Sequence, residues 1–297
     1  MTEILDVINN IGYVQLMDAG NHWRTDPLYR EFRSRNSLAI KKTTGQWFDH
    51  SERSGGSLAQ LIQRTLSLPT LEQTKAYLGD LPLSVNGKDV VELNETKKFD
   101  KQILNKLKKD NSYWHSRGIS DFVLEDFEGG LAENGRMKDR YVFPIFDEKK
   151  DLIGFSGRLV KNNDFLPKWK HLGQKKNFLF PFSATKHILE SKSVMIVESI
   201  GDCLKLMECG IKNVYVSFGV SLSPKIVQQL LKLDVNKILI SLNNEDSFVG
   251  NEAAQEFRNE LTKYFDENQL VIALPTAKDF GEMSCEEILS WKTQYLN

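Results

Sequence analysis

The stretch that decides the fold is residues 194–246, in which three apolar runs each end in a polar or glycine-bearing segment: VMIVESIGDCLKLMECG (194–210), VYVSFG (214–219) and KILISLNNED (237–246). Two of these segments carry the acids Glu198, Asp202, Glu245 and Asp246. The strands of an open parallel sheet have their carboxyl ends along one edge, so acids about forty residues apart can converge there. Carboxylates that converge are typical ligands of divalent cations, and the stretch therefore predicts a metal site.

Strands and helices alternate from residue 194 to the end of the chain. The pattern predicts strands at 194–199, 214–219, 237–243 and 269–275, and helices at 200–209, 223–233, 251–265 and 284–296. Short apolar β runs separated by helices imply a parallel sheet covered on both faces. We therefore expect an α/β fold here, preceded by smaller α+β parts.

The composition is typical of a soluble globular protein of two or three domains. The 297 residues are 40 % hydrophobic and 27 % charged. No apolar run of membrane-spanning length and no secretion signal is present, so we expect no membrane partner and a cytoplasmic location. Cys203, Cys209 and Cys285 are too scattered for a disulfide framework or a zinc ribbon, and we interpret all three as small core or surface residues.

The net charge of -1 hides an uneven distribution of charge along the chain. Residues 136–176 contain eleven Lys or Arg against five Asp or Glu, whereas acids outnumber bases from Ser191 onward. A basic segment beside an acidic, metal-type segment suits a polyanion whose phosphates contact both. An ordinary solvated surface is the alternative, and the charge pattern alone would favour it.

The first 78 residues predict a small β-rich module without a metal. Residues 20–66 alternate β-like runs with turns and enter a helix that Ser57 caps after Gly55-Gly56. The order of parts resembles the zinc-ribbon module that opens DnaG-type primases, but no cysteine lies near His22 or His50, so zinc cannot be held. In this reading hydrophobic packing replaces zinc, around Trp23, Leu38, Ile40, Trp47 and Phe48. A β-rich cap with no role in DNA binding is the alternative.

Residues 101–182 carry six short fragments in an informative order. A polar helix is expected over 101–117, followed by a second short helix and two strands; the fragments are RGI (117–119), RYVFPI (140–145), IGFSGR (153–158), PKW (167–169), KK (175–176) and FLF (178–180). Taken in register, they resemble the N-terminal part of the DnaG-type primase core. Arg140 and Arg158 on adjacent strands suit bidentate phosphate contacts. Lys168, Lys175 and Lys176 suit a template or triphosphate, and Trp169 or Phe178 a stacked base.

The C-terminal part resembles a Toprim domain, the catalytic domain of these primases. The first motif matches Glu198 and Asp202, and a late element matches Pro275 and Lys278-Asp279. In the second motif Asn243 stands where the family has its first Asp, and Glu245 stands at the second. Because an amide oxygen carries no charge, metal affinity should fall unless Asp246 compensates. A working site and a weakened site both remain open, as does a purely structural role for the acids.

The resemblance implies the domain organisation and the reaction. We expect a degenerate zinc-ribbon-like module at 1–78, a linker at 79–100, a basic primase subdomain at 101–182 and a Toprim domain at 183–297. The implied reaction is the joining of ribonucleotides on single-stranded DNA with two Mg²⁺ or Mn²⁺ ions. Asp202, Glu245 and Asp246 would bind the metal with Asn243 assisting, while Glu198 would act as a general base or orient the metal.

The parts that the sequence lacks suggest partners and rivals. No phosphate-binding Gly-x-x-x-x-Gly-Lys-Ser/Thr loop of a helicase is present, so a replicative helicase is expected in trans, as in bacteriophage primases in a bacterial host cytoplasm. A Toprim nuclease is less consistent with segment 117–180, and nothing supplies a topoisomerase tyrosine. A catalytically weakened subunit that binds single-stranded DNA or associates with a helicase is the serious alternative.

Overall fold

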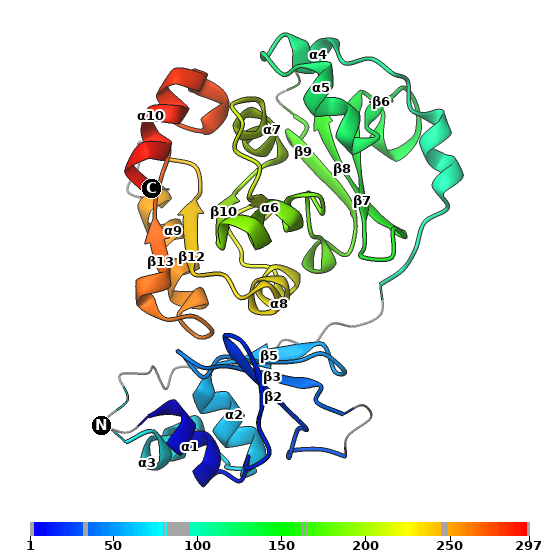
Figure 1. Cartoon of the computed structure of the whole chain (residues 1–297). Helices are drawn as coiled ribbons and strands as arrows, with labels where there is room; N and C mark the ends of the chain where they lie inside the picture. The colour runs from blue at the N-terminus through cyan, green and yellow to red at the C-terminus, as the bar shows by residue number, and fades with distance from the viewer. Residues whose placement is uncertain are drawn as a thin grey trace.

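The computed structural model describes residues 3–31, 35–79, 81, 96–161, 163, 165–244 and 249–295, with side chains in the last range from residue 252. In the described part of the chain three sheets follow one another (Figure 1). They lie within the predicted N-terminal module, the basic subdomain and the Toprim domain. The domain boundaries stay a prediction, and most of the predicted linker lies outside the described residues.

The N-terminal module is a five-stranded antiparallel sheet flanked by short helices. It contains α1 (Ile4–Asn10), β1 (Met17–Ala19), β2 (His22–Thr25), β3 (Leu38–Lys41), β4 (Trp47–Asp49), β5 (Ser54–Gly56), α2 (Leu58–Thr65), η1 (Leu71–Thr74) and α3 (Lys75–Leu78), with strands paired in sequence order. Ser57 caps α2 as predicted, because its hydroxyl accepts from the Gln60 N–H while the Gln60 side chain accepts from the Ser57 N–H. Leu38, Ile40 and Trp47 are buried, as the metal-free interpretation requires.

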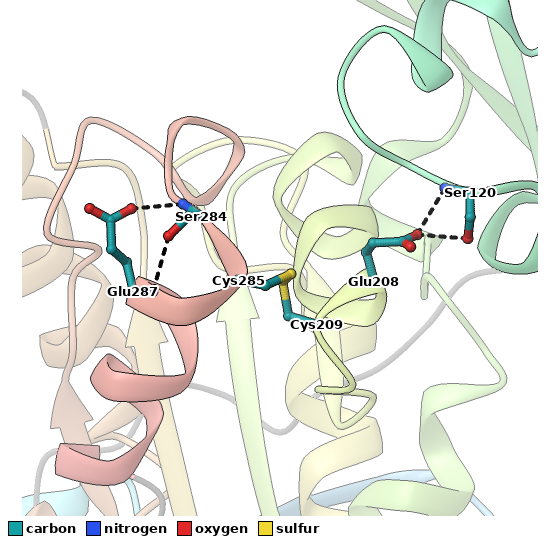
Figure 2. Close-up of a disulfide and its surroundings, with 6 residues drawn as sticks. All are labelled: Ser120, Glu208, Cys209, Ser284, Cys285 and Glu287. Carbon is teal, nitrogen blue, oxygen red and sulfur yellow. Dashed lines mark hydrogen bonds between the residues drawn. A yellow bond between two sulfur atoms is a disulfide. The ribbon is translucent and has the colours of Figure 1, made fainter.

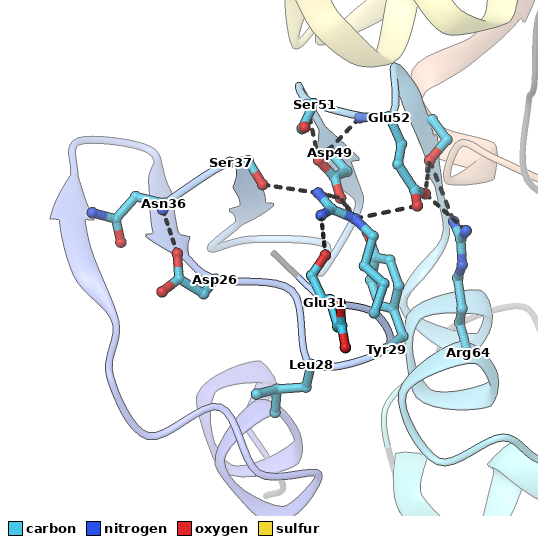
Figure 3. Close-up of polar contacts among 12 residues, drawn as sticks. Asp26, Leu28, Tyr29, Glu31, Asn36, Ser37, Asp49, Ser51, Glu52 and Arg64 are labelled. Carbon is cyan, nitrogen blue, oxygen red and sulfur yellow. Dashed lines mark hydrogen bonds and ion pairs between the residues drawn. The ribbon is translucent and has the colours of Figure 1, made fainter. Parts of the chain in front are cut away.

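A buried ion-pair network also joins the parts of this module (Figure 3). The Asp49 carboxylate has no exposed surface and accepts from Tyr29 Oη at 2.9 Å and from Arg30 Nη2 at 2.6 Å. Arg30 also pairs with Glu52 at 3.2 Å, and Glu52 pairs with Arg64 of α2 at 2.8 Å. The network therefore links β4, the loop after β2 and α2, a polar connection that the hydrophobic interpretation of the sequence missed.

The pKa of Asp49 reflects both its burial and its hydrogen bonds. Burial raises the pKa of its carboxyl, but hydrogen bonds from Arg30, Tyr29 and the Ser51 N–H lower the pKa by more, so that the net pKa lies below the ordinary value. The charge is thus held in the folded state by donors that surround it.

The basic subdomain is built on a four-stranded antiparallel sheet, β6 (Gly130–Ala132), β7 (Arg140–Phe146), β8 (Leu152–Leu159) and β9 (Trp169–Gly173). The predicted helix 101–117 is wrong: η2 (Lys101–Lys106) and α4 (Ser112–His115) are separate turns. Lys108 between them pairs with Leu131 of β6, which an uninterrupted helix would prevent. The remaining short elements are α5 (Asp121–Leu124), η3 (Glu125–Phe127), η4 (Gly135–Met137) and η5 (Lys175–Asn177).

The C-terminal part has the predicted parallel sheet covered by helices. Its strands are β10 (Ser193–Val197), β11 (Val214–Val216), β12 (Lys237–Ser241) and β13 (Leu270–Ile272), in the spatial order β11-β10-β12-β13 with every pair parallel. The helices are α6 (Ala184–Ser191), α7 (Ile200–Glu208), α8 (Pro224–Leu233), α9 (Val249–Leu261) and α10 (Cys285–Tyr295), with turns η6 (Glu267–Gln269) and η7 (Phe280–Glu282). The predicted alternation is confirmed within a few residues.

One hydrophobic core runs through the basic subdomain and the parallel sheet. Trp114 and Phe143 of the subdomain belong to the same buried cluster as Val197, Leu239 and Trp291 of the C-terminal part. The residues between the two sheets therefore pack as in one body, which holds the acids of one part in a set position relative to the cations of the other.

The N-terminal module packs against the C-terminal part near α8, and polar contacts join the two (Figure 1). Lys41 Nζ lies 2.7 Å from Asp234 Oδ1, just after α8, and Gln46 donates to the Tyr264 carbonyl at 2.6 Å. Among the helices that the structure describes, none combines the length and the apolar character that crossing a bilayer requires.

Two of the cysteines differ from the prediction. Cys209, directly after α7, and Cys285, the first residue of α10, form a disulfide across 76 residues of sequence (Figure 2). Cys203 is buried and free, as predicted. The pairing arises because α7 and α10 pack side by side, a proximity that spacing in the sequence does not reveal.

Candidate active site

At the carboxyl edge of the parallel sheet, the described start of the second motif follows a strand adjacent to the one that carries the first. β10 and β12 are adjacent, and Val197 lies opposite Ser241 at their ends. Glu198 follows β10 directly, and the Gly219 N–H donates to its backbone carbonyl at 3.1 Å. Asn243 lies two residues beyond the end of β12. Glu245 and Asp246 lie outside the described residues, so their predicted metal role stays a prediction.

Asp202 lies in the first turn of α7, where its carboxylate accepts hydrogen bonds that stabilise the start of the helix. One carboxylate oxygen accepts from the Ser199 hydroxyl at 2.7 Å and from the Ser199 N–H at 3.2 Å, which closes a capping box. The other oxygen accepts from the Phe280 N–H at 3.2 Å. The oxygen that accepts from Ser199 already has two donors, whereas the oxygen that accepts from Phe280 has a second lone pair and can still accept a further ligand.

A third segment completes this edge of the sheet. The Asn244 N–H donates to the Lys278 carbonyl at 2.8 Å, and the Asn244 side chain donates to the Pro275 carbonyl at 3.0 Å. Asp279 then caps the turn η7 by accepting from the Glu282 N–H at 3.1 Å. The late element of the sequence thus lies beside both acidic motifs.

Crowding of acids and burial alter the acidity of Asp202. Burial is the main cause that raises its pKa to about 6, hydrogen bonds from Ser199 oppose the rise, and the nearby charges of Asp279 and Glu198 add to it. Negative charge is therefore costly at this position, and a bound cation would relieve the cost.

A small cleft of about 70 Å³ joins this edge to the basic subdomain. Asp202, Lys205 and Asp279 line one side, and Arg158 and Trp169 line the other together with Tyr113 and Arg117. Arg158 and Trp169, predicted as nucleic-acid contacts, therefore meet Asp202, predicted as a metal ligand, in one place.

Aromatic rings hold the cationic side of the cleft. Arg158 Nε donates to Tyr113 Oη at 2.8 Å, and its guanidinium lies 5.6 Å from the centre of the Trp169 ring. The Arg117 guanidinium lies 4.9 Å from the centre of the Tyr113 ring. Cation–π contacts of this kind fix the guanidinium planes while leaving N–H groups to donate.

Arg140 does not share this environment, although it was predicted to act with Arg158. It is 3 % exposed and donates to the backbone carbonyls of Gly157 at 3.2 Å, Lys168 at 3.1 Å and Pro167 at 2.7 Å. These contacts favour a positioning role for the segment before β9, and a phosphate contact by Arg140 stays a prediction.

The three predicted lysines lie outside the lining of the cleft. Lys175 Nζ donates to the Phe218 carbonyl at 2.9 Å, beside the loop that follows β11, and Lys168 and Lys176 are exposed. Phe178 is fully buried, so the expectation that it offers a face to a base is wrong. The sequence did not reveal this burial, because only the packing of the two sheets shows that Phe178 lies in the core between them.

Several residues of the cleft were not singled out from the sequence. Arg117 and Asp279 lie in sequence fragments that resemble the primase family, so the sequence did contain a signal for these two residues. Tyr113 and Lys205 had none, because nothing in their spacing sets them apart from ordinary surface residues. Only packing of α4 against the start of α7 brings them to the cleft.

The donors fit a hard divalent cation better than zinc. Oxygen ligands at the end of β10, in α7 and after β12 are those that Mg²⁺ and Mn²⁺ prefer. Within the ranges that the structure describes, no three His, Cys, Asp or Glu side chains form a ready metal-binding group. Two of the three predicted metal ligands that carry charge, Glu245 and Asp246, are outside those ranges.

Known proteins match this chain in sequence. The family model described as Toprim domain matches residues 192–272. DNA primase of Clostridium acetobutylicum is 30% identical over 184 residues, which cover 58% of this chain and 29% of that protein. DNA primase of Enterococcus faecalis is 24% identical over 314 residues, covering 84% of this chain and 49% of that protein. The chain thus spans half or less of the length of these relatives.

Solved structures match the fold. A crystal structure of Aquifex aeolicus primase with zinc-binding and RNA polymerase domains has a TM-score of 0.56 at 19% identity, and the match covers 99% of this chain and 83% of that chain. A DnaG primase catalytic domain bound to ssDNA has a TM-score of 0.54 at 18% identity, covering 66% of this chain and 77% of that one. The chain therefore carries a Toprim domain and has the fold of the DnaG-type DNA primases, to which it is also related in sequence.

Proposed function

We propose that this chain is a primase-type nucleotidyltransferase that synthesises short RNA primers on single-stranded DNA during DNA replication. The observation that carries the proposal is the cleft in which Asp202 and Asp279 face Arg158 and Trp169. Acids that bind divalent ions and cations that bind phosphates are the two halves of a phosphoryl-transfer site. The relationship to DNA primases of Clostridium and Enterococcus supports the same reaction.

Each residue has a task in this proposal. Asp202, Glu245 and Asp246, assisted by Asn243, would hold Mg²⁺ or Mn²⁺, which when bound stabilises the attacking 3′-oxygen and the leaving pyrophosphate. Glu198 would take the proton of the attacking hydroxyl or orient the ligands around it. Arg158, Lys168, Lys175 and Lys176 would bind phosphates of template or ribonucleoside triphosphate, and Trp169 would contact a base.

The partners follow from the same reaction. Single-stranded DNA and ribonucleoside triphosphates are the substrates, a replicative helicase acts in trans, and the setting is the cytoplasm of a bacterium, with a bacteriophage as the source. These proposed partners and this proposed setting rest on the resemblance to DNA primases.

The test is primer synthesis from labelled ribonucleotides on single-stranded DNA with Mg²⁺ or Mn²⁺. We expect short RNA from the wild type and a loss of roughly a hundredfold or more in Glu198→Gln and in the Glu245→Gln, Asp246→Asn double variant. Glu190→Gln is the matched control, because Glu190 is an exposed acid on α6 away from the cleft.

The alternative function, a subunit that binds DNA without catalysis, makes a different prediction. A wild type that makes no RNA even with a replicative helicase added, yet binds single-stranded DNA equally with and without divalent ions, would overturn the primase proposal. Products that persist in both acid variants would remove the assigned residues from the site.

A further inference from the structure

Between β8 and β9, the described residues 160–161, 163 and 165–168 present an exposed apolar pair. Phe165 is 97 % exposed and Leu166 is 49 % exposed, and no other large apolar side chain of the described residues is as exposed as Phe165. Single exposed apolar residues are common, so exposure by itself indicates nothing. Whether this pair has a function therefore depends on the residues around it.

The base of the loop is held from inside the protein. The buried guanidinium of Arg140 donates to the carbonyls of Pro167 and Lys168, and the Leu159 N–H donates to the Lys168 carbonyl at 2.9 Å. Burying a guanidinium is costly unless acceptors satisfy its N–H groups, and here two of the acceptors are carbonyls of the loop. The buried arginine therefore fixes the position of the base of the loop. The Phe165 N–H in turn donates to Asn163 Oδ1 at 3.0 Å. The apolar pair is therefore presented outward on an anchored base.

The charges around the loop select the kind of ligand. Lys168 is exposed beside the pair, and Lys161 is 71% exposed, with Asp139 at 2.7 Å from its ammonium group. Lys170, two residues further along on β9, donates to the Arg136 carbonyl at 2.8 Å. An exposed aromatic ring followed closely in the chain by an exposed lysine fits a nucleic-acid strand better than an apolar or cationic partner.

The loop leads directly into the cleft. Trp169, which lines the cleft opposite Asp202, is four residues from Phe165, and an extended chain of that length spans at most about 13 Å. A base on Phe165 and a base at Trp169 can therefore belong to one short stretch of a single strand.

We propose that Phe165, with Leu166 beside it, is a stacking platform for an unpaired base of single-stranded DNA on its way into the cleft. The proposal rests on the proposed function and adds a contact outside the residues assigned to it. Stacking uses the face of any base, so this contact should depend on the presence of a base and not on its identity.

The test compares binding of a fluorescein-labelled oligothymidylate and an abasic oligonucleotide of the same length, followed by anisotropy. We expect Phe165→Ala to weaken binding of the oligothymidylate roughly tenfold and to leave binding of the abasic strand unchanged. Phe165→Trp should bind like the wild type. Lys168→Ala should weaken both strands, because it removes a phosphate contact.

The matched control is Phe122→Ala, since Phe122 is also exposed, at 77 %, but lies on α5 with Lys212 beside its ring. It should change neither affinity. Equal binding by wild type and Phe165→Ala, an equal loss for both strands, or no binding by the wild type would each overturn the platform. Wild-type primer synthesis with unchanged Phe165→Ala binding would overturn this inference alone, whereas a base-dependent Phe165 effect without primers would overturn only the primase proposal.

Discussion

The Phe280 backbone N–H donates to the Asp202 carboxylate at 3.2 Å, although 78 residues separate the two in sequence. The bond joins the first turn of α7, which carries one acidic motif, to the turn η7 that follows the last strand. Asp202 therefore has two tasks in our proposal, to hold this junction and to bind a cation, and substitutions can separate them.

Asp202→Asn should lose the cation but keep the junction. The amide oxygen can still accept from the Phe280 N–H, but the amide NH₂ then faces the Ser199 N–H and cannot accept from it, so the thermal midpoint should fall less than in Asp202→Ala, while the loss of charge lowers Mn²⁺ affinity at least about tenfold. Asp202→Ala should also lower stability, by roughly 1–2 kcal/mol, because it removes the cap and the acceptor. Mn²⁺ titration calorimetry and scanning calorimetry measure the two effects, and unchanged Mn²⁺ affinity in Asp202→Asn would exclude it as a ligand.

Arg30→Met should destabilise the N-terminal module strongly. It leaves the fully buried Asp49 carboxylate without its main partner, and breaking a buried pair costs roughly 3–5 kcal/mol. Lys42→Met is the control, because its pair with the 75% exposed Asp18 lies at the surface and should contribute less than about 1 kcal/mol. Urea unfolding measures both, and addition of a zinc chelator should leave the wild-type transition in place. A transition that moves with chelator would mean that a metal, not the ion pairs, holds the module.

The contribution of His171 to stability should fall between about pH 6.5 and pH 4. Burial, with Lys175 and Arg140 nearby, lowers the pKa of His171 to about 4 from its ordinary value of 6.5. A folded-state pKa below the unfolded one contributes stability above the unfolded value, and this contribution is lost as pH falls through the folded one. His171→Gln should remove up to roughly 3 kcal/mol of that dependence, measured by urea unfolding against pH.

Reduction should destabilise the oxidised protein through the Cys209–Cys285 bond. The disulfide closes a long loop between α7 and α10, and such bonds contribute roughly 2–4 kcal/mol by restricting the unfolded chain. Dithiothreitol should therefore lower the thermal midpoint of the wild type and leave Cys209→Ser unaffected. Peptide mapping by mass spectrometry without reductant identifies the bond, and an equal shift in both proteins would assign the effect to something else.

Arg140 and Arg158 should respond differently to loss of charge. Arg140→Met removes three hydrogen bonds to buried or half-buried carbonyls and should cost roughly 2–3 kcal/mol of stability. Arg158→Met should leave stability nearly unchanged and reduce affinity for single-stranded DNA, with a shallower dependence on salt. Urea unfolding and anisotropy at several salt concentrations distinguish them. Equal stability losses would mean that Arg158 is also structural.

Much of the fold could be predicted from the sequence because local patterns determine its strands, helices and caps. The alternation of apolar runs and helices over residues 194–296 predicted a parallel sheet, and parallel strands necessarily bring Glu198 and Asn243 to one edge. Ser57 as a helix cap and the absence of zinc ligands near His22 and His50 are likewise statements about neighbours in sequence. Periodicity and capping act over a few residues, and so does the information that predicts them.

What only the tertiary structure decided is which distant side chains meet. Two arginines on adjacent strands look equivalent in sequence, yet Arg140 is buried against carbonyls while Arg158 faces Asp202 across a cleft. The Cys209–Cys285 bond, the ion pairs around Asp49 and the burial of Phe178 likewise depend on how helices and sheets pack. Packing is a property of the whole chain, because each side chain competes for space and partners with residues far away in sequence, and no local pattern records the outcome of that competition.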